Sequence, residues 1–228
     1  MRKLRKVEIP VRVKRRNPYG WNNTIILICL VVFFMKVLTE FAGVYVIQRT
    51  PFGFYRENVV DFFLALTPSR VFIMPWQVVT SIFVHAEFWH LFINMFVLFF
   101  FGSELERRLG EKKYLTIFFA SGLAGSFAYL IYALLTNPYV SAMGASAAIF
   151  GVMGALAVIA PEIRVFIFPF PIPVSIKVAI ILFAIYDLVL LPFSYSTGIA
   201  HIAHLAGLLV GLYLGKRYRV RRIYYGYY

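Results

Sequence analysis

Residues 143–160 read MGASAAIFGVMGALAVIA, an apolar segment that carries no charged residue and is rich in glycine and alanine. Ser146 lies near its start, and Gly151 and Gly154 follow along the segment. Small residues on a membrane helix allow a second helix to approach closely. The segment therefore predicts a tightly packed membrane helix with a hydroxyl group near one end.

A second segment, 203–211, reads AHLAGLLVG and complements the first. His204, Gly207 and Gly211 are spaced i, i+3 and i+7, so they share one face of a helix. If this glycine-lined face packs against the small residues of 143–160, Ser146 lies beside His204. The two segments thus predict a nucleophile next to a base at membrane depth.

The composition of the chain indicates a membrane protein. The chain is 61% hydrophobic and 14% charged, which lies outside the usual range of a soluble domain. A membrane span needs roughly 20 apolar residues. Apolar runs predict six spans, at about 23–46, 89–106, 114–135, 145–160, 174–192 and 200–215. The predicted fold class is all-α, a polytopic membrane protein that forms a compact six-transmembrane-helix bundle.

The connection between spans one and two, 47–88, mixes charged residues with aromatic residues. It is predicted to be an amphipathic element in the membrane interface rather than a span. Lys36 and Glu40 are spaced i, i+4 and are expected to form an ion pair within span one. The expected regions are a basic cytoplasmic tail at 1–20, the six-helix membrane domain at 21–215 and a basic, aromatic cytoplasmic tail at 216–228.

Positive charge predicts the orientation of the chain. The net charge is +13, with eight Lys/Arg residues in the first 16 positions and five between Lys216 and Arg222. Basic clusters beside spans are typical of the cytoplasmic side and of anionic lipid surfaces, so nucleic acid is not an expected partner. Because six spans place both termini on one side, we expect cytoplasmic termini in a multi-pass protein of the cell membrane. The apolar run after the basic start is too long for a cleavable signal peptide.

In this orientation, the polar residues of spans two, four and six gather at the outer face, toward which the site is expected to open. Ser146 is the candidate nucleophile and His204 the candidate general base and acid, because neutral imidazole takes a hydroxyl proton near pH 7. His201, one turn earlier, is the alternative base, but the glycine face aligns with His204. Asp187 is the only acid in spans three to six and is distant from His204 in sequence, so a Ser-His dyad is favoured over a triad.

Acyl transfer also needs hydrogen-bond donors for the oxyanion that develops on the substrate. His90 and Asn94 are four residues apart and share a helix face, and the backbone N–H of Ser146 is free at the start of a helix. These three groups are the candidate oxyanion donors. Alternatively, His90 and Asn94 only tie the segment 47–88 to the bundle. His85 is expected to fix that loop.

In this combination, the chain resembles the rhomboid family of intramembrane serine proteases, in its prokaryotic, six-span type. The family's motifs are present in order between about residues 20 and 215. Its His-x4-His-x3-Asn, Glu-x-Arg, Gly-x-Ser and Ala-His-x-x-Gly-x-x-x-Gly motifs correspond to His85, His90, Asn94, Glu106, Arg108, Gly144, Ser146, Ala203, His204, Gly207 and Gly211. Two positions depart from the pattern: Ala147 replaces the glycine usual after the nucleophile, and Gln77 replaces the arginine usual after the loop tryptophan.

The resemblance implies an intramembrane serine endopeptidase that needs no cofactor and no metal. It would hydrolyse peptide bonds in or near the transmembrane helices of single-span or multi-span membrane proteins in the lipid bilayer, through an acyl-enzyme on Ser146. Because a peptide bond in a helix is shielded, helix-destabilising and small residues are expected near the cut. The resemblance gives a supporting role to Gly144, Gly207, Gly211 and His85, and a structural role to Glu106 and Arg108.

Two other functions stay open from the sequence. A catalytically inactive relative would bind and retain membrane clients without cleaving them. A metal- or haem-binding membrane protein is the other alternative, because all four histidines lie near the outer ends of spans two and six. That function would require the histidines but not Ser146.

Overall fold

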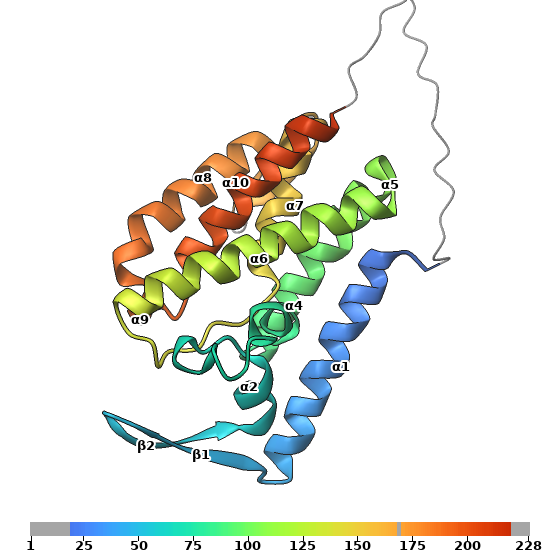
Figure 1. Cartoon of the computed structure of the whole chain (residues 1–228). Coiled ribbons are helices and arrows are strands. Elements are labelled where there is room, and N and C mark those ends of the chain that lie inside the picture. Colours follow the sequence, from blue (N-terminus) through green and yellow to red (C-terminus); the bar gives the residue numbers. More distant parts are fainter. Residues whose placement is uncertain (1–18, 168–169, 220–228) are drawn as a thin grey trace, which may run out of the picture.

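The chain forms a bundle of helices with two short β-hairpins (Figure 1). The structure is a computed structural model that describes residues 19–167 and 170–219, so the expected tails at 1–20 and 216–228 lie largely outside the described residues. Each predicted span contains a helix. These helices are α1 (Trp21–Phe41), α4 (Phe88–Val97) continued by α5 (Ser103–Leu109), α6 (Glu111–Leu135), α7 (Ser146–Ile159), α8 (Ile176–Leu190) and α10 (His201–Tyr218).

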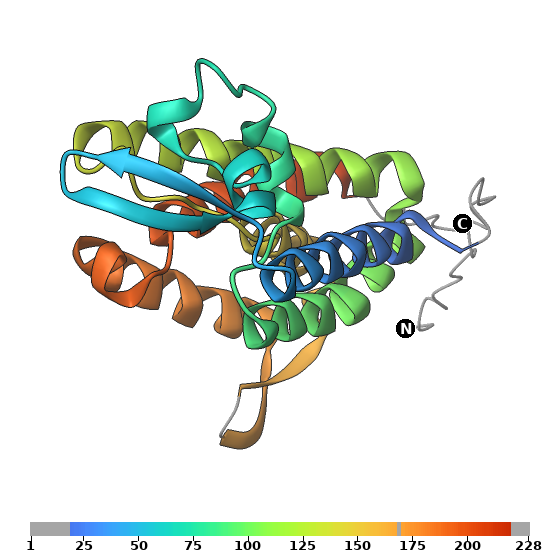
Figure 2. The same cartoon turned by 90° about the horizontal axis from the view of Figure 1, so that it is seen from below.

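Shorter elements connect the main helices. They are α2 (Val59–Leu64), α3 (Gln77–Thr80), α9 (Ser194–Thr197) and the antiparallel hairpins β1 (Tyr45–Thr50) with β2 (Gly53–Asn58) and β3 (Arg164–Ile167) with β4 (Phe170–Ser175). The β3–β4 hairpin projects away from the helices (Figure 2). The prediction of a mainly helical polytopic protein is confirmed, and the two hairpins are additions that it did not include.

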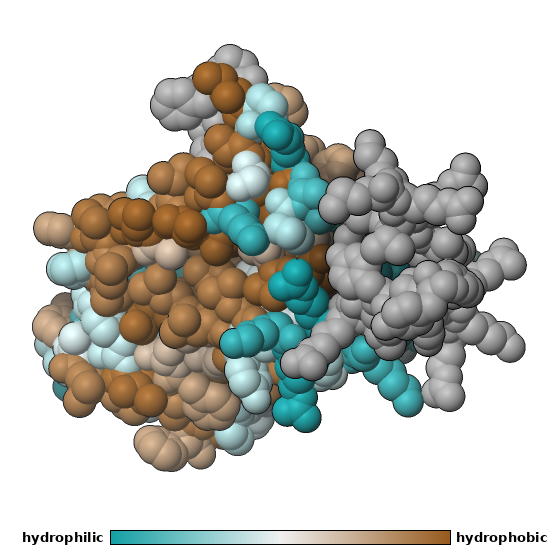
Figure 3. Space-filling view, turned by 90° about the horizontal axis from the view of Figure 1, so that it is seen from above, coloured by the Kyte–Doolittle hydropathy of each residue, from teal (hydrophilic) through white to brown (hydrophobic). Residues whose placement is uncertain are grey.

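Four helices among the described residues are long and apolar enough to cross a membrane: Trp21–Phe41, Phe88–Leu109, Glu111–Leu135 and Ile176–Thr197. The apolar helix α7 has only 14 residues, so at about 1.5 Å per residue it is shorter than a bilayer core of about 30 Å. Apolar residues also cover most of the visible described surface, with hydrophilic residues in a band (Figure 3). The chain is therefore a multi-pass membrane protein, and the number of six spans stays a prediction.

Helix α1 ends before the predicted limit of span one. The N–H of Val44 donates to the carbonyl of Thr39 at 2.9 Å, and the N–H of Gly43 donates to the carbonyl of Glu40 at 3.1 Å. Gly43 has φ +69°, and these bonds form the Schellman turn that ends many helices. The span expected at 23–46 is therefore too long at its end, because the chain turns at Gly43 and enters β1.

Helices α6, α7 and α10 pack against one another and form the centre of the bundle. A methyl group on Gly207 would overlap the carbonyl group of Ala147, and one on Gly211 would overlap the carbonyl group of Gly151. The backbones of α7 and α10 therefore touch where any larger residue would separate them. The close approach predicted from the glycine spacing is present.

The two departures from the family pattern have local partners. A methyl group on Gly125 of α6 would overlap the methyl group of Ala147, so Gly125 provides the room that Ala147 needs. Gln77 is fully buried. Its Oε1 accepts from the N–H of Thr67 at 3.1 Å, and its Nε2 donates to the carbonyl of Phe62 at 2.9 Å. An amide thus anchors the loop at this position.

The segment between α1 and α4 lies at the end of the bundle away from the start of α1 (Figure 1). Lys36 of α1 reaches this segment, where it pairs with Asp61 of α2 at 2.8 Å and donates to the carbonyl of Ala86 at 2.9 Å. Glu40 instead accepts from Nδ2 of Asn58 at 3.0 Å. The expected pair of Lys36 with Glu40 is replaced, because the fold of the loop brings Asp61 closer to the ammonium group.

Candidate active site

Ser146 and His204 are in direct contact. Oγ of Ser146 and Nε2 of His204 form a hydrogen bond of 2.8 Å, and both residues are half-buried. Ser146 is the first residue of α7, and His204 lies in the first turn of α10. The imidazole also stacks on the ring of Phe150, with centroids 4.5 Å apart and planes 9° apart. Helix α7 therefore supplies both the hydroxyl group and a flat surface that orients the imidazole.

Asp187 is the third polar group at this contact, and the predicted dyad did not include it. Its Oδ1 lies 3.2 Å from Nδ1 of His204 and 2.6 Å from Nδ1 of His201. The side chain is buried, at 1% exposure. The chain reverses between α8 and α10, which brings Asp187 back to a histidine 17 residues later. A lone acid within an apolar span was the sequence signal for such a role.

The alternative base, His201, is turned away from Ser146. Its Nδ1 faces Asp187 at 2.6 Å, and its Nε2 faces Oγ1 of Thr197 at 3.1 Å. The side chain is fully buried. Since both ring nitrogens face other groups, His204 is the histidine placed to accept the proton of Ser146.

The predicted oxyanion residues occupy two different positions. A side chain on Gly144 would lie 2.8 Å from Nε2 of His90 and 3.9 Å from Oγ of Ser146, so the His90 ring borders the turn before Ser146. Gly144 has φ +123°, which side chains rarely allow. Asn94 is buried, and its Nδ2 donates to the carbonyl of His90 at 2.7 Å. His90 thus lies near Ser146, whereas the amide of Asn94 is bonded within its own helix.

His85 is buried beside the predicted site. Its ring meets the ring of His90 edge-on, with centroids 5.1 Å apart, and its carbonyl accepts from Nζ of Lys36 at 3.2 Å. Burial, with a smaller contribution from His90, lowers the pKa of His85 from 6.5 to about 3. His85 is therefore neutral at physiological pH and connects the loop before α4 with α1.

The Glu-x-Arg element lies at the other end of the bundle. Oε1 of Glu106 accepts from the N–H of Trp21 at 2.8 Å, and Oε2 accepts from the N–H of Asn22 at 3.1 Å. Glu106 thus satisfies the free backbone donors at the start of α1. Arg108 pairs with Glu162 at 3.0 Å. Both contacts hold elements together far from Ser146.

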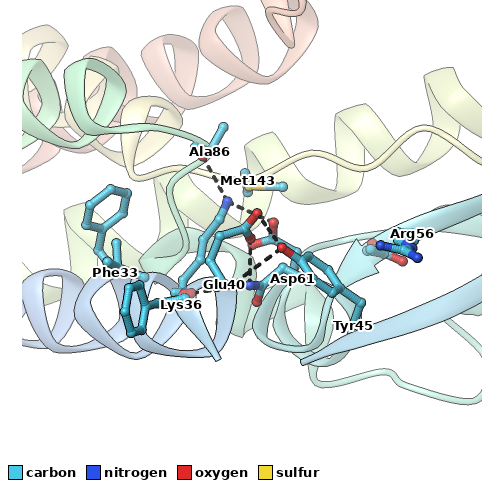
Figure 4. Close-up of a pocket in the computed structure, with 12 residues that line it drawn as sticks. Phe33, Lys36, Glu40, Tyr45, Arg56, Asp61, Ala86 and Met143 are labelled. Atoms are coloured by element: carbon cyan, nitrogen blue, oxygen red, sulfur yellow. Dashed lines mark hydrogen bonds and ion pairs between the residues drawn. The ribbon is translucent and has the colours of Figure 1, made fainter. Parts of the chain in front are cut away.

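Two cavities border the segment that leads into Ser146. The smaller has a volume of about 40 Å³, and its lining includes Ser146 and Gly125. The larger has a volume of about 690 Å³ and lies between α1, the β1–β2 hairpin and α2 (Figure 4). In Figure 4, Lys36 points from α1 toward Ala86 and Asp61 across this cavity. Met143 lines both cavities, so the larger cavity borders the chain segment just before Ser146.

Asp187, His201 and His204 also form the group, among the described residues, with the spacing of a metal site. Their ligand atoms lie within 4.8 Å of one another. The other two histidines, His85 and His90, pack against each other instead. The metal alternative therefore does not gather all four histidines, and its donor set includes the imidazole that contacts Ser146.

The sequence is similar to known proteins that carry the rhomboid name. They include rhomboid-like protease 3 of Toxoplasma gondii, 29% identical over 60% of this chain and 49% of that protein. Rhomboid protease GluP of Bacillus subtilis is 40% identical over 37% of this chain and 16% of that protein. Inactive RHOMBOID-like protein 8 of Arabidopsis thaliana is 35% identical over 36% of this chain and 22% of that protein. The chain matches less than half the length of each of these relatives.

The model of the Rhomboid domain matches residues 74–221. This region is more than half of the chain, and it contains the histidine and asparagine of α4 together with the serine and histidine motifs of α7 and α10. The chain therefore belongs to the rhomboid family.

Proposed function

We propose that this rhomboid is an intramembrane serine endopeptidase that cleaves other membrane proteins through an acyl-enzyme on Ser146. The observation that carries the proposal is the 2.8 Å hydrogen bond between Oγ of Ser146 and Nε2 of His204. A serine hydroxyl is a weak nucleophile until a neighbouring base takes its proton. Its position at the start of a short apolar helix, beside an imidazole, supports covalent catalysis.

The proposed reaction has two halves. Oγ of Ser146 attacks the carbonyl carbon of the scissile peptide bond while Nε2 of His204 takes the hydroxyl proton. His204 then gives this proton to the leaving amine, and the substrate remains as an ester on Ser146. Water attacks the ester with His204 again as the base, which releases the new carboxyl end and restores the serine.

Three donors are proposed for the oxyanion: the backbone N–H of Ser146, the ring of His90 and the amide of Asn94. The ring of His90 borders Gly144, close to the hydroxyl group. Nδ2 of Asn94 is bonded to the carbonyl of His90 at 2.7 Å, so it must turn toward the substrate to contribute. In serine proteases, loss of one such donor lowers kcat by about 10²–10³-fold.

The proposed substrates are single-span or multi-span membrane proteins whose helices unwind near the cut. The cavity beside Ser146 is only about 40 Å³ in volume. Glycine and alanine form much of its lining, at Gly122, Gly125, Ala147, Ala200 and Ala203. Because its lining leaves little room, it favours a small side chain next to the scissile bond.

We also infer that the termini are cytoplasmic and that Ser146 faces the outer side of the cell membrane. The α5–α6 connection carries Arg107, Arg108, Lys112 and Lys113, and the end of α10 carries Lys216 and Arg217. Glu106 of the same connection caps the start of α1, so these basic groups share one end of the bundle. Positive charge is typical of the cytoplasmic end.

The test is cleavage of a fluorescent transmembrane substrate by the purified protein in detergent. Ser146→Ala and His204→Ala should each abolish cleavage, whereas Ser196→Ala, a serine change in the short helix α9, should leave it unchanged. EDTA should have no effect. Full activity of Ser146→Ala would exclude the proposed nucleophile.

The second candidate function is a catalytically inactive protein that retains membrane clients without cutting them, and one relative is itself named inactive. It would bind substrate yet show no turnover in the wild type. A metal protein would lose its function with EDTA and keep it in Ser146→Ala. The contact of Ser146 with His204 favours the peptidase over both, because neither alternative requires it.

A further inference from the structure

Asp187 has an unusual position for a carboxylate in an apolar helix. It is buried in α8, and its Oδ1 lies within hydrogen-bond distance of two imidazoles, on His201 and His204. Its Oδ2 has no hydrogen-bond partner among the described residues. Burying a charged group within a membrane protein costs free energy, and such groups usually have a function. We therefore expect this carboxylate to have a role.

The two hydrogen bonds determine where the histidine protons lie. An ionised carboxylate only accepts hydrogen bonds, so Nδ1 of His201 and Nδ1 of His204 must both carry a proton. In neutral His204, the lone pair is then on Nε2, which lies 2.8 Å from Oγ of Ser146. This is the tautomer that can take the serine proton.

The same carboxylate can stabilise the charge that forms during the reaction. When His204 takes the proton of Ser146, its ring becomes an imidazolium whose Nδ1 lies 3.2 Å from Oδ1 of Asp187. Asp187 is almost fully buried, and attraction between charges is stronger in such surroundings than in water. The carboxylate keeps its negative charge throughout, and the proton stays on the imidazole.

His201 has a different part in this arrangement. Its bond to Asp187 is shorter, 2.6 Å, and its other nitrogen lies 3.1 Å from Oγ1 of Thr197. His201 is therefore placed to hold the carboxylate in position beside Nδ1 of His204. The titratable groups that face His204 are thus Asp187 from α8, His201 from α10 and His90 from α4.

We propose that Asp187 is a positioning residue that fixes the tautomer of His204 and stabilises its imidazolium, and that His201 holds Asp187 in place. The proposal rests on the proposed peptidase function and extends the predicted dyad to a triad with a second histidine behind it. The supporting observation is that Oδ1 of Asp187 lies within hydrogen-bond distance of Nδ1 of both His201 and His204.

The test compares the pH profiles of kcat for the wild type and Asp187→Asn on a transmembrane substrate in detergent. The asparagine amide can donate to Nδ1 and favours the wrong tautomer, so kcat should fall by up to about 10⁴-fold, the loss that the same change causes at a triad aspartate. The acid limb should move to lower pH by about one unit or more, because the imidazolium loses its partner. Glu162→Gln, the same kind of change at an exposed position, should alter neither value.

A purely structural role for Asp187 would lower activity without moving the acid limb, and that result would overturn the proposal. Unchanged kcat and an unchanged limb would also overturn it. In either case, loss of cleavage in Ser146→Ala would leave the peptidase function standing.

A second measurement covers the case in which Asp187→Asn does not fold. Nitrogen NMR of the histidine-labelled wild type, with the signals of His204 assigned by their loss in His204→Ala, reports the tautomer directly. The proposal requires a proton on Nδ1 at neutral pH. A proton on Nε2 alone would contradict it.

Discussion

At the scale of single residues, the orientation of the His204 ring depends on three contacts from three sides. Ser146 bonds to Nε2, Asp187 lies at Nδ1, and Phe150 covers one face of the ring. Each contact restrains a different motion of the imidazole, since two act within the ring plane and one acts on its face. In the proposed peptidase mechanism, these contacts would preorganise the pair for proton transfer before substrate binds.

His85 leads to a prediction on pH and stability. Burial lowers its pKa from 6.5 to about 3, so between these two pH values the unfolded chain binds a proton at His85 that the folded protein does not. The resulting stability is fully present above pH 6.5 and is lost as pH falls toward about 3, with a slope of at most about 1.4 kcal/mol per pH unit. Thermal unfolding in detergent at pH 7, 5 and 4 measures it. His85→Phe should reduce the loss at low pH, and an identical pH response of both proteins would contradict the assignment.

Some contacts of the site follow from a local sequence pattern, and others arise only when the chain folds. Ser146 and His204 were predictable, because glycine spacing along one helix face already implies which faces meet. Asp187 stood out as a lone acid in an apolar span, but its contact with His204 was not predictable, since that contact depends on how the chain returns from α8 to α10. The partner of Lys36 was mispredicted for the same reason: Glu40 is near in sequence, but the fold brings Asp61 to the ammonium group.

At the scale of elements, the contact between α7 and α10 determines the geometry of the site. Ser146 opens one of these helices and His204 lies in the first turn of the other. Gly207 and Gly211 let the backbones touch just beyond this pair. A change in the separation of the two helices would therefore change the distance between the hydroxyl and imidazole groups.

Gly211→Ala tests this contact. Alanine favours a helix over glycine by about 1 kcal/mol, so local propensity alone predicts stabilisation. The added methyl would instead overlap the carbonyl of Gly151, and overpacking destabilises by about 1–3 kcal/mol. We expect a lower unfolding temperature in detergent and a lower rate of substrate cleavage. Leu209→Ala on an exposed part of α10 is the control. Higher stability of Gly211→Ala with full activity would contradict the account.

The elements also show where the sequence pattern was insufficient. The run 23–46 is apolar enough, despite Lys36 and Glu40, to suggest one long span, but the turn at Gly43 ends α1 and the next residues pair in β1. A strand forms only beside a partner strand, and the hydrophobic pattern of 23–46 does not identify that partner. The segment expected to be one amphipathic element accordingly contains a hairpin and short helices.

At the scale of the whole molecule, α6, α7 and α10 form a centre beside which α1, α4 and α8 lie. Apolar side chains exposed on α1 and α8, such as Leu27, Phe34, Ile181 and Leu188, are suited to contact with lipid. Helix α7 packs against α6 and α10 at this centre, so under the proposed function a substrate would have to pass the outer helices or loops to reach Ser146.

The inferred orientation predicts a labelling pattern. The chain has one cysteine, Cys29, which is fully buried, so single cysteines can be added elsewhere. In intact cells, a membrane-impermeant maleimide should label Ser196→Cys in α9 and should label Glu162→Cys at the opposite end only after permeabilisation. Labelling of Glu162→Cys alone in intact cells would reverse the orientation.

The most direct test of the central claim is to locate the nucleophile. The purified wild-type protein is incubated in detergent with a fluorophosphonate, and the modified residue is identified by mass spectrometry of its peptides. We expect one adduct on Ser146 and strongly reduced labelling in His204→Ala. An adduct on another serine, or unchanged labelling of Ser146→Ala, would contradict the claim that Ser146, activated by His204, is the catalytic nucleophile.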